Sequence, residues 1–271
     1  MNVFYDTHAH LDYPDFKGDL SEVIARARLA GITKIISIGT DLQSSQQAML
    51  LAEQFENVYA VSGWHPTNAL EAPDDIRPEL RVLARHPKVV ALGETGLDYY
   101  RLPSGNREPT TDEDQQYQHK QARIFEQQLE VAAELGLNCV IHERSAMEDT
   151  LKIMERFTGK LRGVFHCFSN NLTALGRIMD IGSIVSFTGI VSFKNAQNVR
   201  DAASAAPLGS FMLETDCPYL APLPYRGKRC EPAYVKEISE VIAQVKNCSL
   251  EQLSAETCAT AAQFFPKILT P

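Results

Sequence analysis

Two histidines separated by one residue, near the start of the chain, constrain its fold and chemistry more than any other feature. The apolar run 2–5 predicts a first β-strand, and His8 and His10 follow it directly. Side chains two positions apart in an extended chain point the same way, so both imidazoles face one side. Such a pair suits a shared metal ion, whereas one imidazole at a strand end is more often a surface or core residue. The pair alone leaves both interpretations open.

Segments typical of strands alternate with segments typical of helices along the whole chain. The expected strands are 2–5, 34–38, 58–63, 89–94, 138–142, 162–166, 184–187 and 211–214. The expected helices are 20–30, 42–55, 76–86, 146–157, 172–179, 198–205, 232–245 and 250–265, with a long one that ends near 135 after a polar loop at 101–115.

This alternation predicts the fold class. Eight strands alternating with helices in 271 residues indicate an α/β fold, a single-domain TIM-type (β/α)8 barrel over residues 1–271. An open doubly wound sheet is the alternative, but no glycine-rich nucleotide motif accompanies the early strands.

Charge and cysteine content narrow the class of protein further. The formal net charge of −8 argues against a broad basic face for duplex DNA, although a local basic patch remains open. The sequence shows neither a leading apolar signal region nor an apolar run of membrane-spanning length, so we expect a cytoplasmic protein without a membrane partner. Six scattered cysteines without a C-x-x-C pair indicate reduced thiols rather than a zinc ribbon or a disulfide framework.

Most of the histidines fall where a barrel would build its site. Five of the seven lie at the C-terminal ends of predicted strands, and carboxylates lie at two further ends. These residues are His8, His10, His65, Glu94, His142, His166 and Asp216. Strand ends of this kind converge on one face of a (β/α)8 barrel, so we expect the site there.

The residue types at these ends indicate a metal centre. Imidazoles and carboxylates without thiolates suit zinc or manganese, and magnesium where oxygen ligands dominate. Setting His65 aside, the other six residues are too many for one four-coordinate ion. They predict two divalent ions that share Glu94 as a bridge.

Six motifs that carry these residues resemble those of the TatD family, metal-dependent deoxyribonucleases with amidohydrolase-like barrels. They are Asp6–Asp12, Gly93–Tyr100, Ile141–Arg144, His166–Ser169, Glu214–Leu220 and Arg226–Lys228, the last followed by Glu231-Pro232. They occur in the family's order and span nearly the whole chain. The resemblance implies a cytoplasmic hydrolase that removes nucleotides from DNA 3′ ends, commonly with magnesium.

The resemblance also implies a role for each residue of the site. One ion would be held by His8, His10, Glu94 and Asp216, and the other by Glu94, His142 and His166. His65 would face the scissile phosphate. The chain departs from the family's usual pattern at Thr67, Asn170, Cys230 and Thr260. All the implied metal ligands are present, so these departures bear on substrate handling and rate and not on metal binding.

A hydrolytic mechanism follows as a hypothesis. Two ions would activate a water molecule, Asp216 would accept its proton, and His65 with Arg144 would offset the charge on the phosphate. Basic and aromatic side chains on the predicted loops suit a single-stranded nucleic acid, and we assign substrate binding to Arg144, Arg226, Lys228 and Tyr99.

Two other functions remain open from the sequence. The same centre could hydrolyse esters or amides, as a D-aminoacyl-tRNA deacylase does. A metal-bound barrel could also bind nucleic acid without cleaving it. We expect a monomer with no obligate protein partner.

Overall fold

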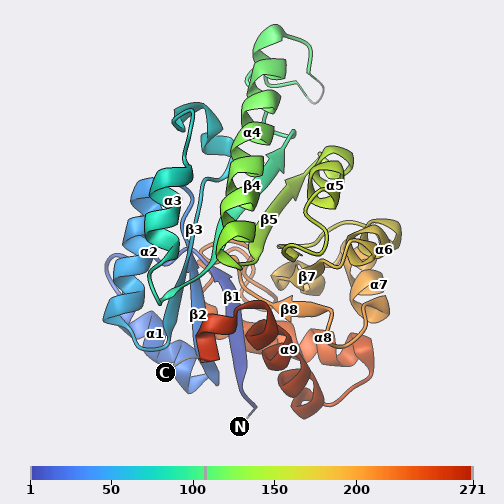
Figure 1. The fold of residues 1–271 in the computed structure, drawn as a ribbon. Coiled ribbons are helices and arrows are strands. Elements are labelled where there is room, and N and C mark those ends of the chain that lie inside the picture. Colours follow the sequence, from blue (N-terminus) through green and yellow to red (C-terminus); the bar gives the residue numbers. More distant parts are fainter. Residues whose placement is uncertain (1, 107–108, 270–271) are drawn as a thin grey trace.

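The predicted barrel is confirmed by the computed structural model, which describes residues 2–106 and 109–269. In this part of the chain eight parallel strands pair in the order β1 to β8 (Figure 1). They are β1 (Phe4–Ala9), β2 (Ile32–Ile38), β3 (Val58–Ser62), β4 (Val89–Asp98), β5 (Cys139–Arg144), β6 (Gly163–Phe165), β7 (Ile184–Phe187) and β8 (Phe211–Leu213).

Helices cover the outside of this ring of strands (Figure 1). They are α1 (Leu20–Leu29), α2 (Leu42–Gln54), α3 (Arg77–Ala84), α4 (Asp112–Leu135), α5 (Met147–Glu155), α6 (Leu172–Asp180), α7 (Gln197–Ala205), α8 (Val235–Lys246) and α9 (Leu250–Phe264). A short 3-10 helix, η2 (Pro66–Glu71), follows β3. Within the described residues, none of the helices has the length and apolarity needed to cross a membrane.

The ring closes between its first and last strands. The main-chain N–H of Asp216 donates to the carbonyl oxygen of His8 at 2.9 Å, and the N–H of His10 donates to the carbonyl of Cys217 at 2.8 Å. Closure therefore brings residues more than 200 positions apart in the sequence side by side, at the C-terminal end of the barrel.

The opposite end of the barrel is filled by apolar side chains. Alternate residues of the strands form one interior cluster, which includes Ile36, Val61, Val90, Val140, Val164 and Met212. Phe264, Phe265 and Ile268, at the end of the chain, pack onto this cluster and are almost fully buried. Because apolar side chains fill this end of the barrel interior, the space for a polar site lies at the other end, where the C-terminal ends of the strands meet.

Three strands, β1, β4 and β5, end later than the sequence predicts. β1 continues to Ala9 and so contains His8 instead of ending before it. β4 continues past Glu94 to Asp98, because Thr95 to Asp98 pair in parallel register with residues 141–144 of β5. The prediction ended this strand at Glu94 because the polar and glycine residues that follow it are typical of a loop.

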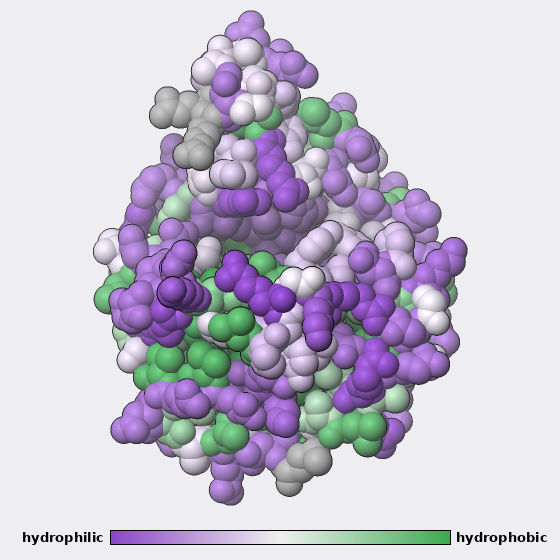
Figure 2. Space-filling view, turned by 180° about the vertical axis from the view of Figure 1, so that it is seen from behind, coloured by the Kyte–Doolittle hydropathy of each residue, from purple (hydrophilic) through white to green (hydrophobic). Residues whose placement is uncertain are grey.

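The long helix α4 begins earlier than predicted, inside the polar stretch 101–115. Thr111 caps it: the N–H of Asp114 donates to the Thr111 hydroxyl at 3.1 Å, and the N–H of Thr111 donates to the Asp114 carboxylate at 3.3 Å. The first turns of α4 and the described residues of the loop before it form the tip that projects beyond the strands in Figure 1. Figure 2 shows a hollow below this tip, edged mainly by hydrophilic residues.

Candidate metal centre

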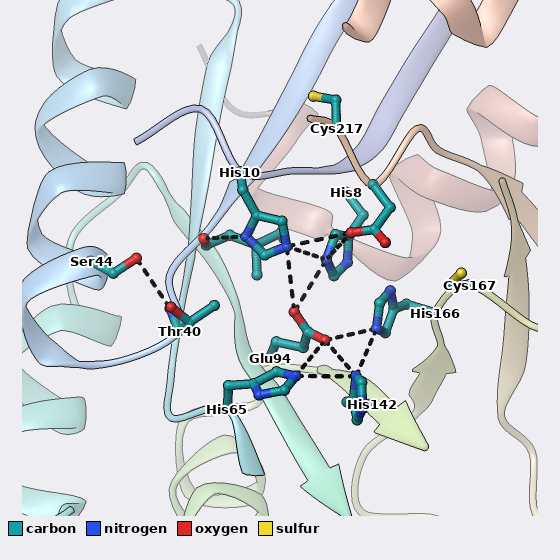
Figure 3. Close-up of polar contacts among 12 residues, drawn as sticks. His8, His10, Thr40, Ser44, His65, Glu94, His142, His166, Cys167 and Cys217 are labelled. Atoms are coloured by element: carbon teal, nitrogen blue, oxygen red, sulfur yellow. Dashed lines mark hydrogen bonds and ion pairs between the residues drawn. The ribbon is translucent and has the colours of Figure 1, made fainter. Parts of the chain in front are cut away.

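Glu94 lies at the centre of the polar cluster, between two groups of imidazoles (Figure 3). Its side chain is almost fully buried. Its Oε1 atom lies 2.7 Å from Nε2 of His166 and 2.8 Å from Nδ1 of His142. Its Oε2 atom lies 3.3 Å from Nε2 of His8. One carboxylate thus faces different residues with each of its two oxygens, as the predicted bridge requires.

The first group combines the two histidines of β1 with the residue that follows β8. Nε2 of His8 lies 3.3 Å from Nε2 of His10. Oδ1 of Asp216 lies 3.4 Å from Nε2 of His10 and 3.7 Å from Nε2 of His8. The sequence predicts that the two imidazoles face one side, and the structure confirms it; the approach of Asp216 depends on closure of the barrel.

The second group contains the histidines of three further segments. Nδ1 of His142 lies 3.3 Å from Nε2 of His166. Nε2 of His65 lies 3.2 Å from Nδ1 of His142 and 3.3 Å from Oε1 of Glu94. The other six residues that the sequence places at strand ends therefore meet around Glu94.

The chemistry of these donors fits divalent cations. Two pairs of ring nitrogens face each other at 3.3 Å, and their lone pairs repel unless a proton or a cation lies between them. The ligand atoms lie within 4.8 Å of one another in three sets: His8, Glu94 and His166; His8, His10 and Asp216; His65, Glu94 and His142. Imidazole and carboxylate donors of this kind suit zinc, manganese and related ions.

Further acceptors lie behind three of the imidazoles. Nδ1 of His10 lies 3.3 Å from the carbonyl oxygen of Ile38, Nε2 of His142 lies 3.4 Å from Oδ2 of Asp98, and Nδ1 of His166 lies 3.6 Å from Oε1 of Glu214. Such outer contacts orient metal-binding imidazoles.

Asp98 and Glu214 are missing from the sequence prediction. Their spacing was an available signal, because Asp98 lies four residues after Glu94 and Glu214 two residues before Asp216. In an extended chain, even spacings of this kind place side chains on one face.

Three of the five imidazoles around Glu94 have raised pKa values when no metal is bound, whereas burial lowers the pKa of His8 and of His65. Burial lowers the pKa of His166, but the carboxylates of Glu94 and Glu214 outweigh burial and set the pKa well above its ordinary value. The same balance of burial against neighbouring carboxylates raises the pKa of His10 and of His142.

The pKa values of the carboxylates Glu94 and Asp216 shift in the opposite direction. Burial raises the pKa of Glu94, but the charges of the surrounding histidines outweigh burial and set it well below its ordinary value. Burial raises the pKa of Asp216 too, and the hydrogen bond with His10 and the nearby imidazolium charges turn this into a net lowering. In the metal-free cluster, anionic carboxylates face protonated imidazoles. Divalent cations can take the place of the protons on these imidazoles.

Gly96 explains how β4 passes so close to β5. Its φ of +140° lies in a region that favours glycine, and a Cβ atom built there would overlap the carbonyl oxygen of His142. Glycine at this position therefore lets the strand continue to Asp98 while it lies against the residue that carries a candidate ligand.

The cluster forms the floor of an open cavity of about 520 Å³. Arg101 and Arg144 line this cavity together with Tyr13 and Tyr219. A second cavity of about 580 Å³ adjoins the first and shares Arg144, Glu143 and Ser169 with it.

The four predicted substrate-binding residues occupy different places. Arg144 lines both cavities. Tyr99 lines the second one, where its hydroxyl donates to Asp149 at 3.0 Å. Arg226 lies 4.2 Å from the ring centre of Phe193, and Lys228 5.9 Å from that of Tyr225. Neither Arg226 nor Lys228 lines either of these two cavities in the described part of the chain.

Comparison with known proteins agrees with this geometry. The sequence model of the family described as TatD related DNase matches residues 5–266. The chain is 35% identical to a Bacillus subtilis protein named uncharacterized metal-dependent hydrolase YabD, over 97% of this chain and 99% of the relative. It is 31% identical to a Klebsiella pneumoniae protein named 3′-5′ ssDNA/RNA exonuclease TatD, over 96% of this chain and 97% of the relative.

A solved structure shows the same fold. The crystal structure of YJJV, a TatD homolog from Escherichia coli, superposes with a TM-score of 0.86 at 27% sequence identity, over 97% of this chain and 98% of that one. Sequence, fold and the residues gathered around Glu94 thus lead to one conclusion: the chain belongs to the TatD family of metal-dependent hydrolases.

Proposed function

We propose that this protein is a 3′–5′ exonuclease that hydrolyses phosphodiester bonds of single-stranded DNA or of nucleic-acid 3′ ends. The observation that carries the proposal is the position of Glu94, whose two oxygens face two separate groups of nitrogen donors at the floor of an open cavity. The name of the Klebsiella relative supports the choice of substrate.

The residues around Glu94 would hold two divalent ions. His8, His10, Glu94 and Asp216 are the proposed ligands of one ion, and Glu94, His142 and His166 those of the other, with magnesium, manganese and zinc as the candidates. When bound, such ions polarise a water molecule and offset the charge of a phosphate.

The remaining steps are assigned to side chains of the cavity. Asp216 would accept the proton of the attacking water, because its carboxylate is anionic near neutral pH and only partly shielded from the cavity, with 15% of its side chain exposed. His65 would face the phosphate, since its Nε2 atom points toward the same space as Glu94. Arg144 would pair with a phosphate oxygen at the wall of the cavity.

The wall of the cavity also suits unstacked bases. The guanidinium of Arg144 lies 4.0 Å from the ring centre of Tyr100, and Tyr219 is 55% exposed at the same mouth. Aromatic rings beside cations bind single strands with little reading of sequence, because every base offers a face for stacking.

The test is digestion of a 5′-labelled single-stranded oligonucleotide by metal-stripped protein, with magnesium, manganese or zinc added back. We expect products that shorten from the 3′ end and an inactive Asp216→Asn control. Absence of cleavage with every metal, in protein that binds two ions, would contradict the proposal and direct the next assay to aminoacyl esters.

A further inference from the structure

His65 differs from three other imidazoles of the cluster, His10, His142 and His166, in what lies behind its ring. The outer nitrogens of His10, His142 and His166 each face an oxygen that can only accept a hydrogen bond from them. A neutral imidazole carries its proton on one nitrogen only. An outer nitrogen that donates therefore leaves the inner nitrogen with a free lone pair, as a metal ligand needs.

The outer nitrogen of His65 faces a donor instead. The main-chain N–H of Thr67 donates to Nδ1 of His65 at 3.1 Å, where His65 caps the start of η2. The Thr67 hydroxyl lies 2.6 Å from the same nitrogen. Because Nδ1 accepts the N–H, it cannot carry a proton itself, and in the neutral ring the proton lies on Nε2.

Several contacts hold the His65 segment in this orientation. The N–H of His65 donates to the carbonyl of Thr40 at 2.9 Å, and the N–H of Asn68 donates to the carbonyl of His65 at 2.9 Å. Gln128 of α4 hydrogen-bonds both the N–H and the carbonyl of Trp64, at 2.9 and 3.0 Å. The ring of His65 therefore has little freedom to turn Nδ1 toward another partner.

We propose that the main chain of Thr67 holds His65 as the tautomer protonated at Nε2, so that His65 is a hydrogen-bond donor to the substrate and not a metal ligand. Distance alone does not make this distinction, since His65 forms one of the three sets of donor atoms within 4.8 Å. Thr67 is then a positioning residue, at one of the sites where the chain departs from the usual pattern of its family. The inference deepens the proposed function, because it states how His65 meets the phosphate.

Metal content separates a donor from a ligand without any substrate. We expect His65→Ala to bind the same number of zinc or manganese ions per chain as the unsubstituted protein, with the same affinity in a titration. The matched variant His142→Ala should lose about one ion per chain. Loss of an ion by His65→Ala to the same extent as by His142→Ala would overturn the proposal. His65→Gln, which keeps a polar side chain of similar length, replaces His65→Ala if the latter does not fold.

Nitrogen NMR of the metal-free protein reads the tautomer directly. Long-range proton–nitrogen spectra of ¹⁵N-histidine protein should show His65 protonated on Nε2 and unprotonated on Nδ1, and His65→Gln identifies its signals by their loss. The opposite tautomer would overturn the proposal. Neither this measurement nor the metal titration uses nucleic acid, so both remain valid if the protein acts on another substrate.

Activity then tests what the donor does. Loss of one preorganised donor to a developing oxyanion lowers kcat by about 10²–10³-fold, and we expect this of His65→Ala with unchanged metal content. His65→Gln should recover part of that loss because its amide retains an N–H group. Thr67→Val keeps the main-chain N–H, so it should preserve the tautomer and lower kcat by less than about tenfold. A tautomer change in Thr67→Val would show that the hydroxyl, not the main chain, sets the proton position.

Discussion

Nε2 of His142 lies 3.4 Å from Oδ2 of Asp98, on the edge of the ring that faces away from Glu94. The opposite nitrogen of the same ring lies 2.8 Å from the Glu94 carboxylate. His142 therefore spans two carboxylates of one strand, because β4 continues for four residues beyond Glu94. The ring is oriented from both sides before any cation binds.

Asp98 should therefore control metal affinity. Asp98→Asn keeps an acceptor for the main-chain N–H groups of Tyr100 and Arg101 but removes the charge behind His142. We expect metal affinity to fall by about 10–100-fold, as for other outer-contact residues of metal sites. A metal titration measures this. Asp149→Asn, whose carboxylate accepts from Tyr99 outside the cluster, is the control and should bind metal normally.

Asp216 should be required for turnover. Removal of a positioned proton acceptor lowers rates by about 10²–10⁴-fold, and we expect a fall of this size in kcat for Asp216→Asn. Circular dichroism should show an unchanged fold, since the main-chain hydrogen bond from Asp216 to His8 remains. Asp201→Asn, on the outer helix α7, serves as the matched variant. Near-normal activity of Asp216→Asn would rule out its assigned role.

Metal binding should release protons near neutral pH. The pKa values of His10, His142 and His166 are raised in the metal-free protein, so these rings hold protons that a metal must displace. Raising the pH from about 6 to about 8 weakens this competition, and metal affinity should therefore increase. Calorimetry in buffers of different ionisation enthalpy counts the released protons. Equal affinity and no proton release across this range would contradict the raised pKa values.

The two predicted arginines should affect substrate binding unequally. Arg144 lines the cavity and Arg226 stacks on Phe193 outside its walls. A hydrogen bond to a charged group contributes about 1.5–3 kcal/mol, so Arg144→Ala should raise KM for single-stranded DNA by about 10–100-fold. Arg226→Ala should change KM by less than about threefold, as for an exposed charge. Steady-state kinetics at two salt concentrations compares them, and equal effects would place Arg226 on the substrate path.

Gly96 should be intolerant of a side chain. Gly96→Ala forces a Cβ atom against the carbonyl oxygen of His142 and requires a backbone conformation unfavourable for alanine. We expect the free energy of unfolding to fall by at least about 2 kcal/mol. Gly176→Ala, in α6 with nothing within 4 Å of its added Cβ, should raise it by about 0.5–1 kcal/mol. Urea unfolding measures both, and a neutral Gly96→Ala would mean that β4 can move away from β5.

The order and type of the elements could be predicted from the sequence because they depend on local patterns. Short apolar runs alternate with amphipathic segments, and parallel strands joined by helices have few ways to close. Histidines at the ends of several strands then had to converge on one face, whatever the details of register. The predicted meeting of His8, Glu94 and His142 depends only on this topology.

Strand length and outer contacts depended on the tertiary structure. The residues after Glu94 are polar and glycine-containing, so only their pairing with β5 shows that the strand continues to Asp98. The tautomer of His65 likewise follows from the N–H that faces its outer nitrogen, which no sequence pattern specifies. The sequence by itself determined which residue types reach the mouth of the barrel. Only the folded chain decided which atom of each residue faces inward, because a ring's orientation is set by donors and acceptors that come from other strands and loops.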